Sequence, residues 1–217
     1  MGVHKVFWED PYQTELDTTV TAAVGDRITV RDTIAYAYSG GQESDAGTIG
    51  GYEILKAEKE EASQEIWYTL PDTHRLQAGD AVHMTIDWRR RYRLMRLHFA
   101  AELVLECMYQ YFGHPEKIGA HISEEKARVD FFWDGNISAV FPELEVKLAD
   151  LIRQNAPIVS AFSDEALQRR YWEIEGFARV PCGGTHIKRT GEVGRLALKR
   201  KNIGGGKERI EIMLAED

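Results

Sequence analysis

Two short pairs of metal-binding residue types, 80 positions apart, constrain this chain most. His98 and Glu102 stand four residues apart in a run of strong helix formers without Gly or Pro. A helix puts such residues on one face, about one turn apart. Cys182 and His186 flank two glycines that let the backbone turn both side chains toward a common point. Because imidazole, carboxylate and thiolate all ligate zinc, we expect the fold to close both pairs around one zinc ion.

Each pair taken alone has a simpler explanation. His98 and Glu102 could be a surface pair or a satisfied buried contact, as most His and Glu residues at helical spacing are. Cys182 and His186 are harder to explain in this way, since Pro-Cys-Gly-Gly-Thr-His offers little to a hydrophobic core. Only the combination of the two pairs favours the metal.

The cysteine content agrees with a metal site in a reducing compartment. The chain has two cysteines, Cys107 and Cys182, without a disulfide framework, and its N-terminus has no apolar signal segment. We therefore expect a cytoplasmic protein without a membrane segment. Cys107 lies in the apolar run 103–108, where we expect a small buried thiol.

The charge is distributed unevenly along the chain. The formal net charge is -8, but residues 1–87 carry 6 Lys/Arg against 16 Asp/Glu, while residues 88–217 carry 21 against 19. Basic residues gather beside both ligand pairs. They are Arg89, Arg90, Arg91, Arg93 and Arg96, and then Lys188, Arg189, Arg195, Lys199, Arg200, Lys201, Lys207 and Arg209. Such clusters are often only solvated or salt-bridged, but their place beside the ligands favours phosphate binding.

The pattern of apolar and turn residues predicts an α+β chain divided near Asp87. Short strands at 5–8, 27–30, 34–38, 47–49, 66–70 and 81–86, separated by turns, predict a small N-terminal antiparallel β-barrel over residues 1–87. Residues 88–217 form the second, α+β domain. There we expect helices at 88–112, 141–155 and 164–171, and strands at 127–132, 158–162, 193–198 and 209–214, the last two joined by a turn at 202–207.

A Gly-Gly-Gln segment, Gly40, Gly41 and Gln42, stands out in the first domain. It lacks the Gly-Lys-Ser/Thr ending of a phosphate loop and the spacing of a dinucleotide fingerprint. A plain turn explains any Gly-Gly pair. Glycines also let a backbone approach a ligand closely, and Gln42 adds a donor and an acceptor beside them.

Taken in order, these motifs resemble the free-standing alanyl-tRNA editing proteins, the AlaX family, in its medium-length type. The resemblance runs from Gly-Gly-Gln through Gly79-Asp80-Ala81-Val82 and the first ligand pair to Arg128-Val129-Asp130-Phe131 and Cys182-Gly183-Gly184-Thr185-His186. These proteins are similar to the editing domain of alanyl-tRNA synthetase. The resemblance implies a barrel domain followed by a zinc-binding editing domain. It implies hydrolysis of the ester that joins serine, or glycine, to alanine tRNA.

The resemblance also implies roles for particular residues. His98, Cys182 and His186 match zinc ligands of the family, and Glu102 stands where the family usually has His. Gly40, Gly41, Gln42 and Thr185 are the candidates for substrate binding. The candidates for tRNA contacts are Arg89, Arg90, Arg93, Lys199, Arg200, Lys201 and Lys207. The partner implied is mischarged alanine tRNA, with neither DNA nor a membrane.

Two departures from the family pattern leave alternatives open. Glu102 can ligate zinc but makes a bound water less acidic, and Phe99, where Thr is frequent, removes a hydroxyl that could recognise serine. The alternatives are a zinc-stabilised tRNA-binding module without hydrolytic activity and a zinc hydrolase of another aminoacyl-tRNA. We assign no general base. His121 is a candidate, but a loop histidine without a catalytic role is the simpler explanation.

Overall fold

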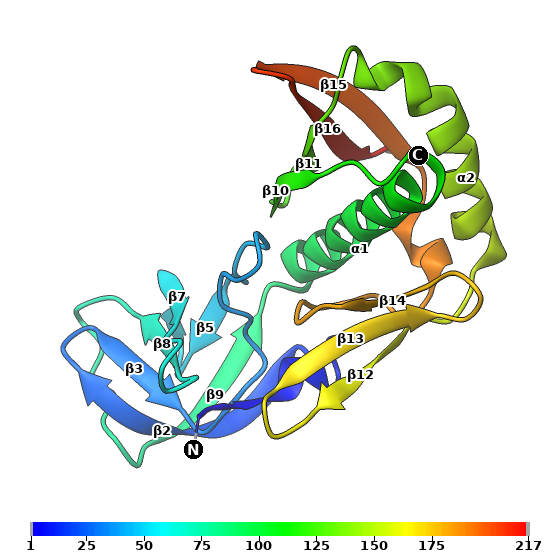
Figure 1. The fold of residues 1–217 in the computed structure, drawn as a ribbon. Coiled ribbons are helices and arrows are strands. Elements are labelled where there is room, and N and C mark those ends of the chain that lie inside the picture. The colour runs from blue at the N-terminus through cyan, green and yellow to red at the C-terminus, as the bar shows by residue number, and fades with distance from the viewer. Residues whose placement is uncertain (1, 216–217) are drawn as a thin grey trace. The chain divides into compact units, whose positions relative to one another are not determined.

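The computed structural model describes residues 2–215, which form two compact units. The first unit holds the described residues up to Ser39 together with Glu43–Tyr92. The second holds Gly40–Gln42 and the described residues from Arg93 onward. The architecture is α+β, with strands making up most of the elements and two α-helices within residues 2–215 (Figure 1). None of the described helices is long and apolar enough to cross a membrane.

The first unit is built on one antiparallel sheet of seven strands, in the order β6-β5-β9-β2-β3-β8-β7. The strands are β2 (Glu15–Val24), β3 (Arg27–Val30), β5 (Gly47–Ile49), β6 (Tyr52–Glu53), β7 (Lys56–Lys59), β8 (Ile66–Thr69) and β9 (Ala81–Ile86). A two-residue parallel pair, β1 (His4–Lys5) with β4 (Asp32–Thr33), lies beside it.

The curl of this sheet comes from its longest strand, β2, which is not among the strands expected from the sequence. Residues of β2 up to Thr19 pair with β9, whereas those from Val20 onward pair with β3, and the register shifts between Val20 and Ala22. Such a bulge bends the strand and increases its twist. The edge strands β6 and β7 do not pair with each other within the described residues, so the sheet is a curled half-barrel and not a closed barrel.

Two expected strands of the first unit were wrong for a physical reason. Residues 34–37 are buried and Tyr38 is exposed, and the five join no strand ladder, because several of their backbone groups bond to side chains instead. The Arg91 guanidinium donates to the carbonyl of Ile34, and the Tyr36 N–H donates to Asp45. At 5–8 only the end of β1 is a strand, and a 3-10 turn, η1 (Val6–Trp8), buries Phe7.

Within the described residues, the second unit has two antiparallel sheets, two α-helices and two short 3-10 helices. Its four-stranded sheet has the order β10-β11-β16-β15, and its three-stranded sheet the order β12-β13-β14. The elements are α1 (Trp88–Tyr111), β10 (Lys117–Ile122), β11 (Ala127–Phe132), η2 (Ile137–Val140), α2 (Phe141–Gln154), β12 (Val159–Asp164), β13 (Arg169–Ile174), β14 (Ala178–Pro181), η3 (Thr190–Val193), β15 (Leu196–Gly204) and β16 (Lys207–Leu214).

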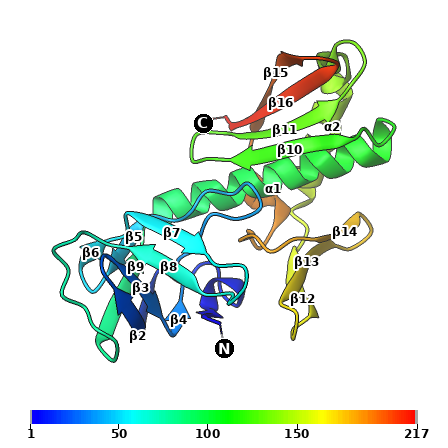
Figure 2. The same cartoon turned by 60° about the vertical axis from the view of Figure 1, so that its left-hand side comes forward.

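Helix α1 is the central element of this unit, although its first residues, 88–92, belong to the first. Figures 1 and 2 agree that α1 passes between the four-stranded and the three-stranded sheet. Side chains on several faces of the helix are accordingly buried, including Leu97, Phe99, Leu103 and Val104 at 0% exposed. A residue in the middle of α1 is therefore held rigidly, and His98 lies there.

The expected helices at 88–112 and 141–155 and the strands at 127–132 and 158–162 are confirmed within a few residues. The expected helix at 164–171 was wrong. Asp164 accepts a hydrogen bond from the N–H of Leu167 at 2.9 Å, which closes a turn between β12 and β13. The pairing of the last two strands is confirmed, but β15 starts only at Leu196 and the turn narrows to Gly205 and Gly206.

Candidate metal centre

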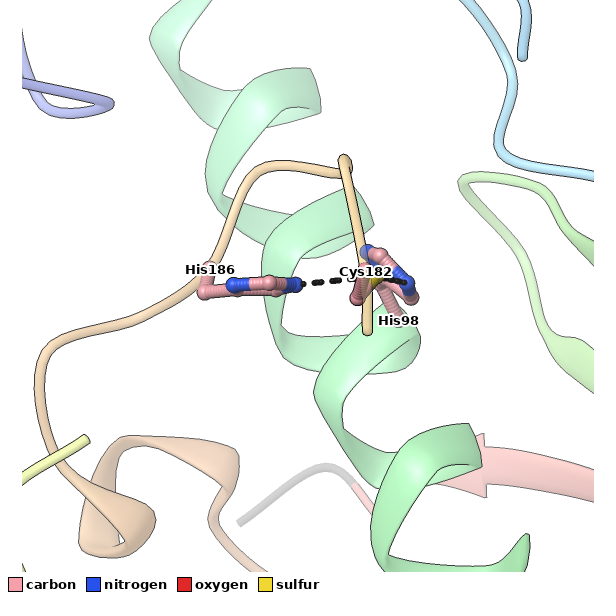
Figure 3. Close-up of side chains that lie close together, drawn as sticks. All are labelled: His98, Cys182 and His186. Atoms are coloured by element: carbon pink, nitrogen blue, oxygen red, sulfur yellow. Dashed lines mark hydrogen bonds between the residues drawn. The ribbon is translucent and has the colours of Figure 1, made fainter. Parts of the chain in front are cut away.

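Three of the four expected ligands converge on one point of the second unit. His98 comes from the middle of α1, and Cys182 and His186 come from the loop that follows β14 (Figure 3). Cys182 Sγ lies 3.5 Å from His98 Nε2 and 3.3 Å from His186 Nε2. The ligand atoms of the three residues all lie within 4.8 Å of one another, a group that could hold a metal ion.

Glu102, the expected fourth ligand, borders this group. Its Oε1 lies 3.2 Å from His98 Nε2 and 3.5 Å from Cys182 Sγ. The i, i+4 spacing on α1 puts the carboxylate and the imidazole on one face, as expected. Two imidazoles, a thiol and a carboxylate around one point form a donor set that fits Zn²⁺ better than the harder Mg²⁺ or Ca²⁺.

The loop can approach α1 so closely because residue 184 is a glycine. A Cβ on Gly184 would lie 2.0 Å from Cε1 and 2.6 Å from Nδ1 of His98, and 2.9 Å from Oε1 of Gln42. We call residues 182–186 the ligand loop. Any side chain at position 184 would push this loop away from α1. The second glycine of Cys-Gly-Gly-Thr-His thus serves close packing against a ligand side chain.

Burial and neighbouring charge set opposite protonation states for the two histidines. Burial alone would lower the pKa of His98, but its contacts with Cys182 and Glu102 outweigh burial and raise it to about 10. Burial, reinforced by the charge on His98, lowers the pKa of His186 to about 3. For Glu102 burial acts upward, yet contact with His98 brings its pKa down to about 2. His98 must therefore release a proton when its Nε2 takes a metal.

Ser160, on β12, holds the second imidazole in place. Its Oγ lies 2.9 Å from His186 Nδ1. When the Nδ1–H donates to this oxygen, Nε2 keeps its lone pair and faces Cys182. Outer hydrogen bonds of this kind fix the tautomer and ring orientation of a ligand histidine. Nothing in the sequence marked Ser160, because the contact joins residues of two separate segments.

We expect Ser160→Ala to weaken zinc binding about 10- to 100-fold, the usual effect of losing an outer partner of a ligand histidine. Competition with a chromogenic chelator measures the affinity. Ser163→Ala is the matched control, because Ser163 lies on the same strand and its hydroxyl donates to the carbonyl of Arg169, away from the imidazole of His186. Equal affinities of the two variants would show that Ser160 does not orient His186.

The Gly-Gly-Gln segment lies against the ligand loop. Gln42 Nε2 donates to Thr185 Oγ1 at 2.9 Å, and the Thr185 N–H donates back to Gln42 Oε1 at 3.4 Å. Gly41 accepts from the N–H of Ile122 at 2.8 Å, which fastens the segment to the edge of β10. A Cβ on Gly41 would lie 2.6 Å from the carbonyl oxygen of Ala120, and its φ is +86°. The segment that the sequence placed in the first domain therefore packs with the second.

Phe99 and Trp172 close the apolar side of the centre. Both side chains are 0% exposed, and their ring centroids are 5.1 Å apart in an edge-on arrangement. Phe99 also lies edge-on to the imidazole of His186, with 5.8 Å between centroids. His121, by contrast, lies on strand β10 and not in a loop.

The basic residues expected to contact phosphates fall into different surroundings. Arg91, which belongs to the first basic cluster but not to the candidates for tRNA contacts, is fully buried and paired with Asp45. Arg90 pairs with Glu43, and Arg93 donates to the carbonyl of Glu124. Arg200 is held by both carboxylate oxygens of buried Glu208. Arg89, Lys199 and Lys201 are exposed, and Lys207 is partly exposed.

Comparison with known proteins identifies relatives of this chain. Residues 171–211, which include Cys182 and His186, match the family model described as the threonyl and alanyl tRNA synthetase second additional domain. The chain is 32% identical over 213 residues to the alanyl-tRNA editing protein AlaX-M of Pyrococcus horikoshii, with 97% of each chain covered.

Two further relatives extend the comparison. AlaX-M of Methanosarcina barkeri is 30% identical over 240 residues, with 97% of this chain and 98% of the relative covered. An alanine–tRNA ligase of Methanococcus maripaludis is 30% identical over 227 residues, which are 95% of this chain but 25% of that longer protein. The likeness to the editing proteins runs through nearly the whole of both chains, and on this ground the chain belongs to the family of alanyl-tRNA editing proteins.

Proposed function

We propose that this chain is a trans-editing hydrolase that cleaves the ester between alanine tRNA and a wrongly attached amino acid, serine first and glycine second. The observation that carries the proposal is the convergence of His98, Cys182 and His186 in a chain whose full-length relatives are named alanyl-tRNA editing proteins. The place of action would be the cytoplasm, where tRNA is charged. No membrane and no DNA take part.

In this proposal His98, Cys182, His186 and Glu102 hold one Zn²⁺. A bound zinc ion supplies Lewis acidity toward an ester carbonyl and a site for water. The buried Thr185 hydroxyl accepts from Gln42 and keeps its own proton to donate, so it can recognise the hydroxyl of a seryl group. A buried polar partner of this kind discriminates well against substrates that lack the matching group.

Phe99 does not supply a hydroxyl to this recognition. It packs against Trp172 and His186 and keeps water from the back of the site. Exclusion of water strengthens every electrostatic interaction within the site. Gly40 and Gly41 bring the Gln42 amide to the ligand loop, so their role in substrate binding is to place Gln42.

The role of Glu102 is tested by two substitutions. We expect Glu102→Ala to lower zinc retention and hydrolysis together, because three remaining donors hold the ion less firmly. Glu102→His should restore zinc binding and part of the activity. Glu106→Ala, one turn further along α1, is the control and should change neither. Full zinc content in Glu102→Ala with no hydrolysis would make Glu102 a base and not a ligand.

Hydrolysis of a panel of aminoacylated alanine tRNAs tests the function. We expect the serylated tRNA to be deacylated fastest, the glycylated tRNA more slowly and the correctly alanylated tRNA little. Deacylation of another mischarged tRNA alone would make the chain a hydrolase of a different aminoacyl ester. If the protein binds tRNA and zinc but hydrolyses none of these esters, it is a zinc-stabilised binding module.

A further inference from the structure

One face of the four-stranded sheet points outward and is rich in cations. Successive side chains of a strand alternate between the two faces. On β11, Val129 and Phe131 are buried while Phe132 is 43% exposed, which identifies the outward set by register. The charged members of this set are Arg128, Asp130, Lys199, Lys201, Lys207, Arg209 and Glu211. The face thus carries five cations against two carboxylates.

Ion pairs within the face engage some of these cations and leave others available. Arg128 and Arg209 both bind the carboxylate of Asp130. Lys199 and Lys201 are exposed and form no ion pair within the part of the chain that the structure describes. Arg200 lies between them in sequence but faces the other way, where Glu208 holds it. Lys199 and Lys201 can therefore contact a phosphate on the outward face, whereas Arg200 is paired with Glu208 on the opposite face.

Phe132 is an exposed aromatic side chain on this charged face. It lies opposite Lys207 in the register, and Lys207 Nζ is 5.5 Å from the centroid of its ring. An exposed aromatic ring among lysines on a β-sheet has the chemistry that single-stranded nucleic acids require, since bases stack on the ring and phosphates meet the cations. A ring surrounded by charged side chains has little to offer an apolar protein partner.

The face leads to the metal centre through the segment Gly40–Gln42. This segment pairs with β10 at Ile122, and Gln42 contacts Thr185 of the ligand loop. Adjacent strands are about 4.8 Å apart, so the sheet spans roughly 14 Å from β15 to β10. Along β11, Phe132 lies roughly 17 Å from the end of the strand that faces Gln42. These dimensions suit a few unpaired nucleotides.

We propose that the outward face of this sheet binds the unpaired 3′-terminal nucleotides of the tRNA, with one base stacked on Phe132 and the backbone phosphates on Lys199, Lys201 and Lys207. The proposal rests on the proposed function for the identity of the RNA. It adds to that function, because Phe132 and this face of the sheet lie outside the metal centre.

Affinity for uncharged alanine tRNA, measured by fluorescence anisotropy, tests this proposal. We expect Phe132→Ala to weaken binding about 5- to 150-fold without changing the dependence on salt, as the loss of one base–aromatic stack does. Phe132→Trp should retain the affinity. The double variant Lys199→Ala/Lys201→Ala should instead lower the slope of log affinity against log salt by about 1.4, for two phosphates of a single strand.

The same tRNA without its unpaired 3′ nucleotides is the second probe. Wild type and Phe132→Ala should bind it equally, because the stacked base is missing. Val146→Ala removes another exposed apolar side chain, on α2, and should change nothing. Thermal unfolding confirms that each variant is folded. If Phe132→Ala binds the intact tRNA as wild type does, or loses as much affinity for the shortened tRNA, the proposal is overturned. Binding is read without hydrolysis, so an inactive enzyme would not affect this result.

Discussion

Cys182→Ala should lose both zinc and hydrolysis. The sulfur lies between the two imidazoles, 3.5 Å from His98 Nε2 and 3.3 Å from His186 Nε2. Its removal takes away the one thiolate donor of the centre and leaves two histidines and Glu102, three donors that hold the ion less firmly than four. Losing an outer partner already costs about 10- to 100-fold in metal affinity, and the loss of a ligand should exceed this. Zinc content by elemental analysis and the rate of deacylation measure the two effects.

Cys107→Ala is the matched control, since it removes the other thiol of the chain. Cys107 is 0% exposed within α1, and burial raises the pKa of its thiol to about 12, so it remains protonated and does not compete for metal. We expect this variant to lose about 1 kcal/mol of stability through lost packing and to keep its zinc. Equal zinc content of the two variants would contradict the assignment of Cys182 as a ligand.

Gly184→Ala should disable the centre without removing any ligand. The added Cβ would lie 2.0 Å from Cε1 of His98 and 2.9 Å from Oε1 of Gln42, so the loop or the imidazole must move. A displacement of about 1 Å at a reacting centre costs about 100-fold in rate. We expect a loss of this size in deacylation, together with weaker zinc binding and about 1–3 kcal/mol of overpacking strain.

Gly119→Ala provides the comparison for this substitution. Gly119 lies on β10 of the same unit, has an ordinary φ, and has no heavy atom within 4 Å of the position its Cβ would take. The same chemical change should therefore leave zinc binding and rate near those of wild type. A Gly184→Ala protein with normal zinc affinity and rate would show that the loop does not need its close approach to His98.

The parts of the centre that could be predicted from sequence are those set by local geometry. Helical spacing brought Glu102 to His98, and the glycines before His186 allowed it to turn back toward Cys182. Ser160, Trp172 and the bond between Gln42 and Thr185 could not be predicted in this way. The last joins residues 143 positions apart, and no local pattern encodes such a contact.

In the fold, too, local patterns were predictable from the sequence and contacts between distant residues were not. The helix at 141–155 was predictable because its apolar residues repeat at helical spacing, and Leu144 and Leu148 are indeed buried. Residues 34–38 have the composition of a strand, yet side chains of Arg91, Tyr68 and Asp45 bond to several of their backbone groups. The run of basic residues shows the same limit, because its composition does not reveal that the Arg91 guanidinium is buried while Arg89 is exposed.

The most direct test of the account is the deacylation of serylated alanine tRNA before and after metal removal. The protein is purified without chelator, its zinc content is measured, and the rate is followed after a chelator and again after zinc is restored. We expect about one zinc per chain, a loss of hydrolysis on removal and its return on addition. A metal-free protein that hydrolyses the ester at the full rate would contradict the central claim, and so would a zinc-loaded protein that leaves the ester intact.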